Sequence, residues 1–375
     1  MKRRKGDKEE ESKRCCLLQL PLAQSMASSF NLEKAVCNHG FFMMAPNLWI
    51  PSTKTLQRPL RLADSITSVT VRISHPPKHH SIHVLVLDTK ALSSPDQQAL
   101  LRQVARMLRI SEEDERKISE FHKIHSKAKK RGFGRLFRSP SLFEDIIKSI
   151  LLCNCYWQRS LQMATALCEL QLELKGGSVD KNAEHASMTQ RIGLKRKQAT
   201  NAVNVVNTTI GDFPSSKELA SLNDNFLNDR LKLGYRARQI LKLAQGVEAG
   251  IIRLEKLEGE EEEAVYKKLM RIEGIGSFTC ATILMSIGFY DKIPADTETV
   301  SHFQELHGRK DCTIKTVNKY AKEIYGKFSP FQCLAYWFEL LQVYEKKVGK
   351  LSKLPPSSYY KVNCSIGTSA CGSTW

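Results

Sequence analysis

The sequence predicts an α+β fold that is mainly α, with a small antiparallel β layer near the N-terminus followed by an all-α body. Residues 69–73 and 82–87 predict the β layer, because their apolar and polar residues alternate as in strands with one buried face. From residue 93 to about residue 350, apolar residues recur instead at helical spacing. With 42% apolar and 26% charged residues, the composition is that of a globular chain.

Changes in composition along the chain predict four segments. Residues 1–28 are basic and then rich in Ser and Gln, so we expect a flexible tail. Residues 29–115 form the β-rich domain and residues 116–350 the helical domain. Residues 351–375 are rich in Ser, Gly and Pro, which predicts a second flexible tail. Within the helical domain, the polar residues 175–190 predict a surface loop to which we assign no chemistry.

Helical periodicity begins after Ser93, where Ser94 and Pro95 supply a cap and a first-turn proline. This first helix is expected to continue to about Leu108. The same spacing predicts further helices near residues 143–153, 158–170, 227–232, 237–249, 262–272, 277–287, 297–306, 313–325 and 330–346.

The net charge of the chain indicates which kinds of molecule it binds. The chain has 57 Lys and Arg against 39 Asp and Glu, a formal net charge of +18, and such a charge attracts nucleic acids or anionic membranes. No run approaches the ~18 apolar residues of a membrane span, so we expect no membrane partner. Eleven Cys without a secretory signal predict reduced intracellular thiols. The basic cluster at residues 2–5 predicts a nuclear location, the alternative being a solvated terminus without a specific role.

A helix, a Gly-x-Gly turn and a second helix are predicted over residues 269–282. We expect an apolar helix to end at Gly274, Gly276 to adopt a positive φ, and Ser277 to cap the next helix. The exposed amides of Gly274, Ile275, Gly276 and Ser277, together with the positive end of the second helix, would bind a DNA phosphate. Such a contact reads no base.

About twenty residues after this turn, Asp296 precedes an apolar helical run that begins at Thr297. An Asp in this place is by itself most simply a helix N-cap. Its position close behind a phosphate-binding hairpin favours a second role as a catalytic carboxylate.

Residues 269–300 resemble the helix-hairpin-helix, Gly/Pro-rich loop and Asp signature of the helix-hairpin-helix/GPD superfamily of DNA glycosylases. The resemblance is to the branches that contain 8-oxoguanine glycosylases and the second bacterial type of 3-methyladenine glycosylases. Residues 132–145 and 233–238 are similar to two further blocks of this family, in the same chain order. The resemblance covers residues 30 to about 350, without the two tails and the 175–190 loop.

This resemblance implies a hydrolase of base excision repair that flips a damaged base out of double-stranded DNA and cleaves its N-glycosidic bond. Asp296 would stabilise the oxocarbenium-like transition state. Phe278 stands where the bifunctional branch carries its Lys nucleophile, so we expect a monofunctional enzyme, acting as a monomer on alkylated bases. The alternatives are a non-catalytic DNA-structure-binding protein and an 8-oxoguanine-type bifunctional glycosylase/lyase.

Further residues are assigned to the base pocket or to a wedge that fills the gap left by the flipped base. Asn154, Cys155, Tyr156 and Arg159 follow the first core helix where the family inserts such residues, the alternative being an ordinary helix–helix turn. Tyr336 aligns with the Gln from which 8-oxoguanine glycosylases read the base. An aromatic residue there favours stacking on an electron-poor base, the alternative being that Tyr336 packs in the core. Phe278 is expected to stack in the same way.

No cofactor is expected. An iron–sulfur cluster like that of some relatives needs four closely spaced C-terminal Cys, and only Cys364 and Cys371 are present there. The family's hairpin does resemble a monovalent-cation site, here formed by the backbone carbonyls of Met270, Ile272 and Ile275.

Two further clusters were considered. The stretch from Phe121 to Phe143 contains seven Lys or Arg and no acidic residue, which predicts a strip that follows the DNA backbone, a solvated charge run being the alternative. His79, His80 and His83 lie in or beside a Pro-bounded turn without a second ligand cluster, so no metal is assigned to them.

Overall fold

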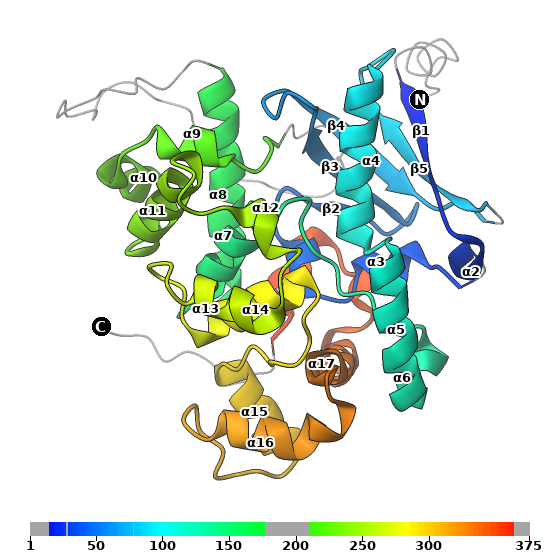
Figure 1. Cartoon of the computed structure of the whole chain (residues 1–375), viewed down its shortest axis with the longest axis vertical. Coiled ribbons are helices and arrows are strands. Elements are labelled where there is room, and N and C mark those ends of the chain that lie inside the picture. Colours follow the sequence, from blue (N-terminus) through cyan, green and yellow to red (C-terminus); the bar gives the residue numbers. More distant parts are fainter. Residues whose placement is uncertain (1–14, 28, 78, 177–209, 364–375) are drawn as a thin grey trace.

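The computed structural model describes residues 15–27, 29–77, 79–176 and 210–363. It confirms the predicted fold class, because an antiparallel sheet at the N-terminal end is followed by a helical body (Figure 1). The strands are β1 (Cys16–Pro21), β2 (Leu48–Ile50), β3 (Thr55–Arg61), β4 (Ser68–Ser74) and β5 (Ser81–Val86).

The helices agree in large part with the predicted periodicity. Those of the first half are α2 (Gln24–Ala27), α3 (Leu32–Val36), the 3-10 turn η1 (Gly40–Met43), α4 (Ser94–Leu108), α5 (Glu112–Ile124), α6 (Ser126–Arg131), α7 (Leu142–Leu152) and α8 (Trp157–Lys175). Those of the second half are α9 (Ser216–Ala220), α10 (Asp224–Leu231), α11 (Arg236–Glu248), α12 (Leu254–Leu257), α13 (Glu262–Leu269), α14 (Ser277–Ile287), α15 (Thr297–Leu306), α16 (Val317–Tyr325), η2 (Gly326–Phe328) and α17 (Gln332–Val348). Helix α5, which Ser111 caps, was not predicted.

The sheet has the strand order β1-β5-β4-β3-β2, with every neighbouring pair antiparallel. Pairing of β4 with β5 confirms the two predicted strands, and Val71 lies opposite Val86 with both side chains buried. Strand β3 was not predicted, and it contains Pro59 although it lies between two partners. A proline cannot donate a ladder hydrogen bond, which is why local sequence argues against such a strand.

The predicted N-terminal tail at residues 1–28 is wrong from residue 16 onward. Strand β1 pairs with β5 along its whole length, and Leu18, Leu22 and Met26 are buried in the core. The partner strand follows more than sixty residues later, at Ser81–Val86, so no local periodicity could indicate this pairing. The basic cluster at residues 2–5 lies outside the described residues.

The predicted C-terminal tail at residues 351–375 is also wrong in its first part. Two 3-10 helices, η3 (Leu351–Lys353) and η4 (Pro356–Lys361), bury Leu351 and Tyr359. Two indole N–H groups bind this segment, because Trp49 donates to the Ser352 carbonyl and Trp157 to the Tyr359 carbonyl, each at 2.8 Å. The segment therefore belongs to the folded body. Cys364 and Cys371 lie outside the described residues, as do residues 177–190 of the predicted surface loop.

Two hydrophobic clusters hold the molecule together. The first joins the inner face of the sheet to α4, α7, α8, α11 and the buried side of α14. The second packs α5 and α6 against α15, α16 and α17 (Figure 1). Within the described residues, no helix has the length and apolar character needed to cross a membrane. Helix α14 contributes to both clusters, with Ile283 and Leu284 in the first and Met285 in the second.

Candidate active site

The turn between α13 and α14 has the predicted helix-hairpin-helix arrangement, but the first helix ends earlier than predicted, at Leu269 and not at Gly274. Gly274 has a φ of +88°, and a Cβ atom there would lie 2.5 Å from Cδ of Gln239. Glycine is therefore required at Gly274 for two reasons. Gly276, by contrast, has a φ of −93° and open space around it. The prediction of a positive φ at Gly276 is thus wrong, because the left-handed residue of the turn is Gly274.

The N-terminus of α14 has no side-chain cap. Gly276 is the N-cap residue, and Ser277 is already the first helical residue, so the prediction that Ser277 caps the helix is wrong. Both residues are exposed, whereas Ile275 is buried and anchors the turn. The first amides of an α-helix lack intrahelical partners and attract anions. The absence of a capping side chain leaves this end of α14 available to a phosphate group.

Asp296 is the N-cap residue of α15 and is held by Thr299. Its Oδ1 accepts the backbone N–H of Thr299 at 2.9 Å and the hydroxyl of Thr299 at 3.0 Å. The N–H of Asp296 lies 3.3 Å from the same hydroxyl, which completes a capping box. The carboxylate is therefore fixed in one orientation.

The surroundings of Asp296 change its acidity. Burial raises the pKa of its carboxyl above the ordinary value, and the two hydrogen bonds from Thr299 only partly counteract this shift. A carboxyl group with a raised pKa is a stronger base than an ordinary Asp, and in its ionised form it can stabilise positive charge or take a proton from water.

Tyr336 contacts Thr299, the residue that holds Asp296, and its ring is not accessible to a flipped base. Its side chain is 2% exposed, and its hydroxyl lies 2.9 Å from Oγ1 of Thr299. The rings of His302, Phe303 and Tyr325 pack against it edge-on. The prediction that Tyr336 stacks on a flipped base is wrong for this structure, because tertiary packing covers the ring.

The predicted wedge loop lies beside the hairpin helix. Sγ of Cys153, at the end of α7, lies 2.7 Å from Oγ1 of Thr279 in α14. Burial raises the pKa of the Cys153 thiol, and the charge of Asp296 adds to the shift. The end of α7, the start of α14 and the start of α15 are therefore close enough to form one site. Phe278, two residues after Gly276, is half-buried at this junction.

Individual wedge residues differ in what they offer. Asn154 has a φ of +46° and is exposed, and Tyr156 is 88% exposed, so both are free to meet a ligand. Cys155 is half-buried. Arg159 is committed to the protein, because its guanidinium donates to the carbonyls of Leu231 and Lys232 at the end of α10.

A second block of the sequence resemblance, residues 233–238, holds the wedge loop in place. Arg236 donates to the Cys153 carbonyl and, at 3.1 Å, to the Asn154 carbonyl. The Asn154 amide donates to the Tyr235 hydroxyl at 3.4 Å. Tyr235 is half-exposed beside it. The sequence could not indicate this contact, which joins α11 to the loop after α7.

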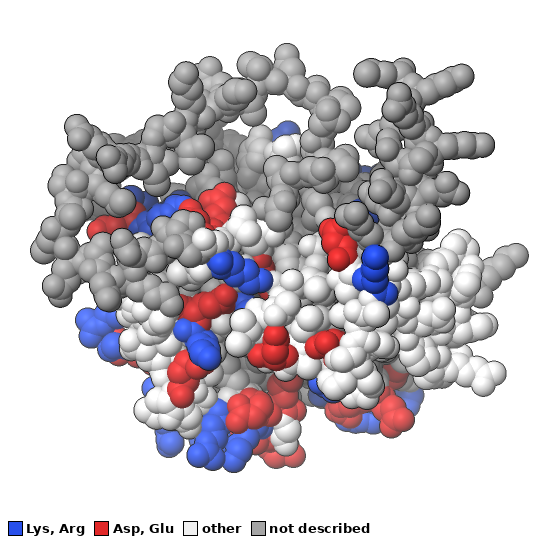
Figure 2. All heavy atoms as spheres, turned by 90° about the horizontal axis from the view of Figure 1, so that it is seen from above, with Lys and Arg blue, Asp and Glu red and all other residues white. Residues whose placement is uncertain are grey.

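The basic strip at residues 121–143 divides into two parts. Lys123, Lys127, Lys129, Lys130 and Arg131 are exposed, and they remain candidates for a DNA backbone contact. Arg135 forms an ion pair with Glu115, and Arg138 donates to the Ser286 carbonyl at 2.8 Å. Those two arginines therefore contact other parts of the protein and stabilise the fold. Among the described residues on the face drawn in Figure 2, basic and acidic side chains lie intermixed.

The monovalent-cation site at the hairpin stays a prediction. The Ile272 carbonyl accepts the Ile275 N–H at 3.1 Å. A carbonyl oxygen has a second lone pair, so this bond leaves room for a cation. Met270, the C-cap residue of α13, is 40% exposed, and Ile275 is buried.

Comparison with solved structures decides the fold. The apo 8-oxoguanine glycosylase/lyase of Clostridium acetobutylicum matches with a TM-score of 0.54 and 14% identity, covering 83% of this chain and 93% of that chain. The 3-methyladenine DNA glycosylase of Archaeoglobus fulgidus matches with a TM-score of 0.53 and 17% identity, covering 86% and 97%. The chain has the fold of the helix-hairpin-helix DNA glycosylases.

A third solved structure is the Clostridium acetobutylicum enzyme in complex with double-stranded DNA containing cytosine opposite 8-oxoguanine. It matches this glycosylase fold with a TM-score of 0.53 and 15% identity, covering 84% of this chain and 92% of that chain. No protein-family model and no curated protein matches the sequence significantly. The likeness is thus carried by the tertiary structure.

One residue of the candidate site was missed at the sequence level. Thr299 holds both Asp296 and Tyr336, and its spacing of three residues from Asp296 is the signature of a capping box. That spacing could have indicated the pair in advance.

Proposed function

We propose that this protein is a DNA glycosylase of base excision repair, with Asp296 as its catalytic carboxylate. The proposal rests on a half-buried carboxylate, fixed by Thr299 at the start of α15, together with the uncapped N-terminus of α14. The two are linked through Cys153, whose pKa is raised by burial and by the charge of Asp296 and whose Sγ contacts Thr279 in α14. An anion bound at that helix end would bring a nucleotide's sugar toward Asp296. The glycosylase fold supports the same function.

The proposed chemistry is hydrolysis of an N-glycosidic bond. As the base leaves, positive charge develops on the deoxyribose, and an ionised Asp296 stabilises that charge. The same carboxylate can orient or deprotonate the attacking water. The raised pKa of Asp296 strengthens its action as a base, because it holds a proton more tightly than an ordinary Asp.

Phe278 supports a monofunctional reaction. A Lys nucleophile would form a Schiff base with the sugar and permit strand cleavage, and a phenyl ring cannot do this. The nearby Lys292 forms an ion pair with Glu262 at 3.6 Å and lies over the Tyr266 ring. This amine is therefore already engaged.

The proposed substrate is a damaged, alkylated base. We propose further that the protein acts as a monomer and that it is located in the nucleus.

The deciding experiment is single-turnover base release from duplexes that contain an alkylated adenine, hypoxanthine, 8-oxoguanine or uracil. Wild type is compared with Asp296→Asn at protein concentrations that saturate the DNA. Asparagine caps helices as well as Asp does, so the variant should fold and bind DNA while base release is lost. Release at the wild-type rate from Asp296→Asn would contradict the assignment.

Two alternatives have their own outcomes in this experiment. The capping role of Asp296 favours a non-catalytic DNA-binding protein, which would bind the duplexes tightly and release no base. A bifunctional enzyme would be trapped covalently on damaged DNA by borohydride.

Tyr156→Ala serves as a DNA-contact variant, because an 88% exposed side chain contributes little to the core. We expect weaker binding of damaged DNA without loss of stability.

A further inference from the structure

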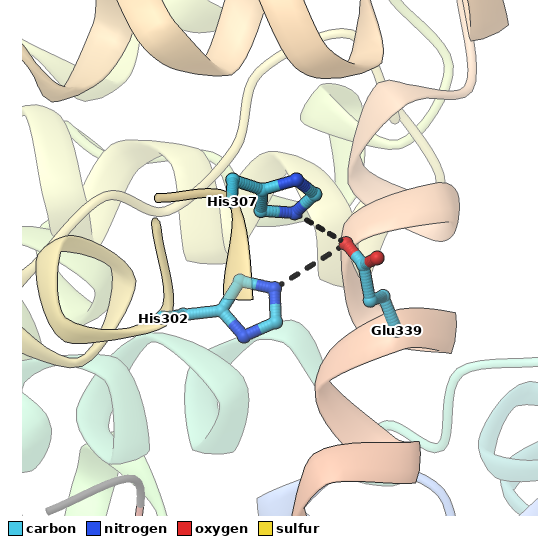
Figure 3. A group of neighbouring side chains, drawn as sticks. All are labelled: His302, His307 and Glu339. Carbon is cyan, nitrogen blue, oxygen red and sulfur yellow. Dashed lines mark hydrogen bonds and ion pairs between the residues drawn. The ribbon is translucent and has the colours of Figure 1, made fainter. Parts of the chain in front are cut away.

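A cluster of metal-ligating side chains lies at the far end of α15 from Asp296. Nε2 of His302, Nε2 of His307 and a carboxylate oxygen of Glu339 all lie within 4.8 Å of one another. Figure 3 shows both imidazoles, from α15 and its C-cap, pointing at the same carboxylate oxygen of Glu339 in α17. The two Nε2–Oε2 distances are 3.4 Å for His302 and 2.9 Å for His307. Among the described residues, no other such group was found.

A fourth oxygen completes the cluster. The Tyr325 hydroxyl donates to Oε2 of Glu339, and it lies 3.2 Å from Nε2 of His302 and 3.4 Å from Nε2 of His307. Four polar atoms from α15, α16 and α17 therefore converge on one point. Ligand atoms around a tetrahedral zinc ion bound at about 2.0–2.2 Å lie about 3.3–3.6 Å apart. The His302–Glu339 distance and the two Tyr325–His distances are close to this range, whereas His307 and Tyr325 are hydrogen-bonded to Glu339 at shorter range and would move apart on metal binding.

The environment of the cluster suits a cation. His302 is buried, and its Nδ1 has no hydrogen-bond partner among the described residues, so contacts at Nε2 determine where the ring points. Oε2 of Glu339 faces both imidazoles and the Tyr325 hydroxyl, so the carboxylate is held in place by the same groups. The cluster also lies at the C-terminal end of α15, where the helix dipole favours positive charge.

The site can be reached from solvent. A cavity of about 560 Å³ is lined by His307, Tyr325 and Glu339, together with His125 and Phe338. Side chains of His307 and Glu339 are 21% and 30% exposed, whereas that of His302 is fully buried. A metal ion could thus enter from the cavity, and one coordination position would face it. Asp296 does not line this cavity.

We propose that His302, His307 and Glu339 form a binding site for a divalent transition-metal ion of the zinc type. Two neutral imidazoles and one carboxylate are a ligand set that binds Zn²⁺, with Tyr325 or a water in the fourth position. On binding, each Nε2 proton leaves for the other ring nitrogen or for solvent, and the freed lone pair coordinates the metal. The ion would join α15 to α17, and the proposal does not depend on glycosylase activity.

The test uses the full chain, freed of metal by a chelator and titrated with Zn²⁺ in a calorimeter. We expect one equivalent to bind, with a rise in the unfolding temperature. Loss of an outer-shell partner already weakens metal binding roughly 10–100-fold, so His307→Ala and Glu339→Gln should weaken it by at least about 100-fold. His79→Ala combined with His80→Ala is the matched control, because both are exposed histidines of the turn to which no metal was assigned. This control should bind like wild type.

Cobalt substitution distinguishes this site from the cysteines, of which the described residues contain nine, none of them in a disulfide. Co²⁺ bound to nitrogen and oxygen gives visible bands without the near-ultraviolet sulfur charge-transfer band. That spectrum is expected for wild type, so the test does not depend on the folding of any variant. A thiolate band, the absence of stoichiometric binding, or equal binding by wild type and Glu339→Gln would each overturn the proposal. The cluster would then be a hydrogen-bonded polar network.

Discussion

One oxygen of Asp296 receives two hydrogen bonds from a single residue, Thr299. The backbone N–H of Thr299 donates at 2.9 Å and its hydroxyl at 3.0 Å to the same Oδ1. Because both donors belong to the first turn of α15, the carboxylate cannot rotate without breaking the helix cap. The residue proposed for catalysis is thus held by the same contacts that start its helix.

Replacing Asp296 by Asn should stabilise the protein at neutral pH. Burial raises the pKa of Asp296, so the folded state binds the proton more tightly than the unfolded state. This contribution to stability is present below the unfolded pKa and is lost as the pH rises through the folded pKa. Asparagine keeps the cap without the buried charge. Thermal unfolding should show a higher midpoint for Asp296→Asn at pH 7 and no advantage at pH 3. Equal midpoints at pH 7 would show that the carboxylate is not desolvated.

Base release should depend on the ionisation of the same group. If Asp296 must be ionised, the single-turnover rate falls in acid, with a midpoint above the ordinary Asp pKa of 3.8 because burial shifts it upward. The measurement is the rate of base release between pH 4 and 8 at saturating enzyme. DNA binding, followed in parallel by fluorescence anisotropy, corrects for loss of affinity. A rate that stays constant down to the ordinary Asp pKa would count against this role for Asp296.

Thr299→Val should damage both the cap and the position of Asp296. The variant removes the hydroxyl that bonds Asp296 and leaves the buried Tyr336 hydroxyl without that partner. Each lost hydrogen bond costs about 0.5–1.5 kcal/mol, and more when the partner is charged, so we expect a total loss of about 1–3 kcal/mol in urea unfolding. Thr299→Ser retains the hydroxyl and is the control.

Tyr336→Phe should cost about 1 kcal/mol of stability and leave base release nearly unchanged. A base contact at Tyr336 would instead predict a large loss of base release.

The two hairpin glycines should respond differently to Ala. At Gly274 the positive φ and the contact with Gln239 both oppose a Cβ, and strained backbone alone costs about 1–3 kcal/mol. Gly274→Ala should therefore lower the unfolding free energy. Gly276→Ala should leave stability within about 0.5 kcal/mol, the usual range for surface changes, and weaken DNA binding if a phosphate approaches this amide. Chemical denaturation and anisotropy with a duplex separate the two effects. Equal stability losses would mean that the turn strain is shared between both glycines.

A buried ion pair joins the sheet to the helical body. Arg58 in β3 donates to both carboxylate oxygens of Glu144 in α7, at 3.2 and 2.9 Å. Burial alone would raise the pKa of Glu144, but the charges of Arg58 and Lys148 lower it to about 2. Glu144→Gln leaves buried cations uncompensated and should cost about 3–5 kcal/mol in denaturant unfolding. The wild-type contribution is present above the unfolded pKa and is lost as the pH falls toward 2, so the difference between the two proteins should shrink in acid. A difference that does not change with pH would point to packing as the cause.

Much of the fold was accessible from sequence because it depends on short-range patterns. Helices α14 and α15 begin and end where periodicity and flanking residues predicted them, at Ser277–Ile287 and Thr297–Leu306. Strands β4 and β5 followed from alternation. These features repeat over a few residues, so neighbouring residues carry the information.

The sequence also determined which residues carry the candidate chemistry, since Asp296, Gly274 and Phe278 stand in a recognisable order. Tertiary structure alone decided how these residues are used. It covered the Tyr336 ring, committed Arg159 to the end of α10, and brought β1 to its partner β5. It also gathered His302, His307 and Glu339 from two helices. Contacts of this kind join residues far apart in the chain, and burial depends on everything that packs around a side chain, so no local pattern can encode them.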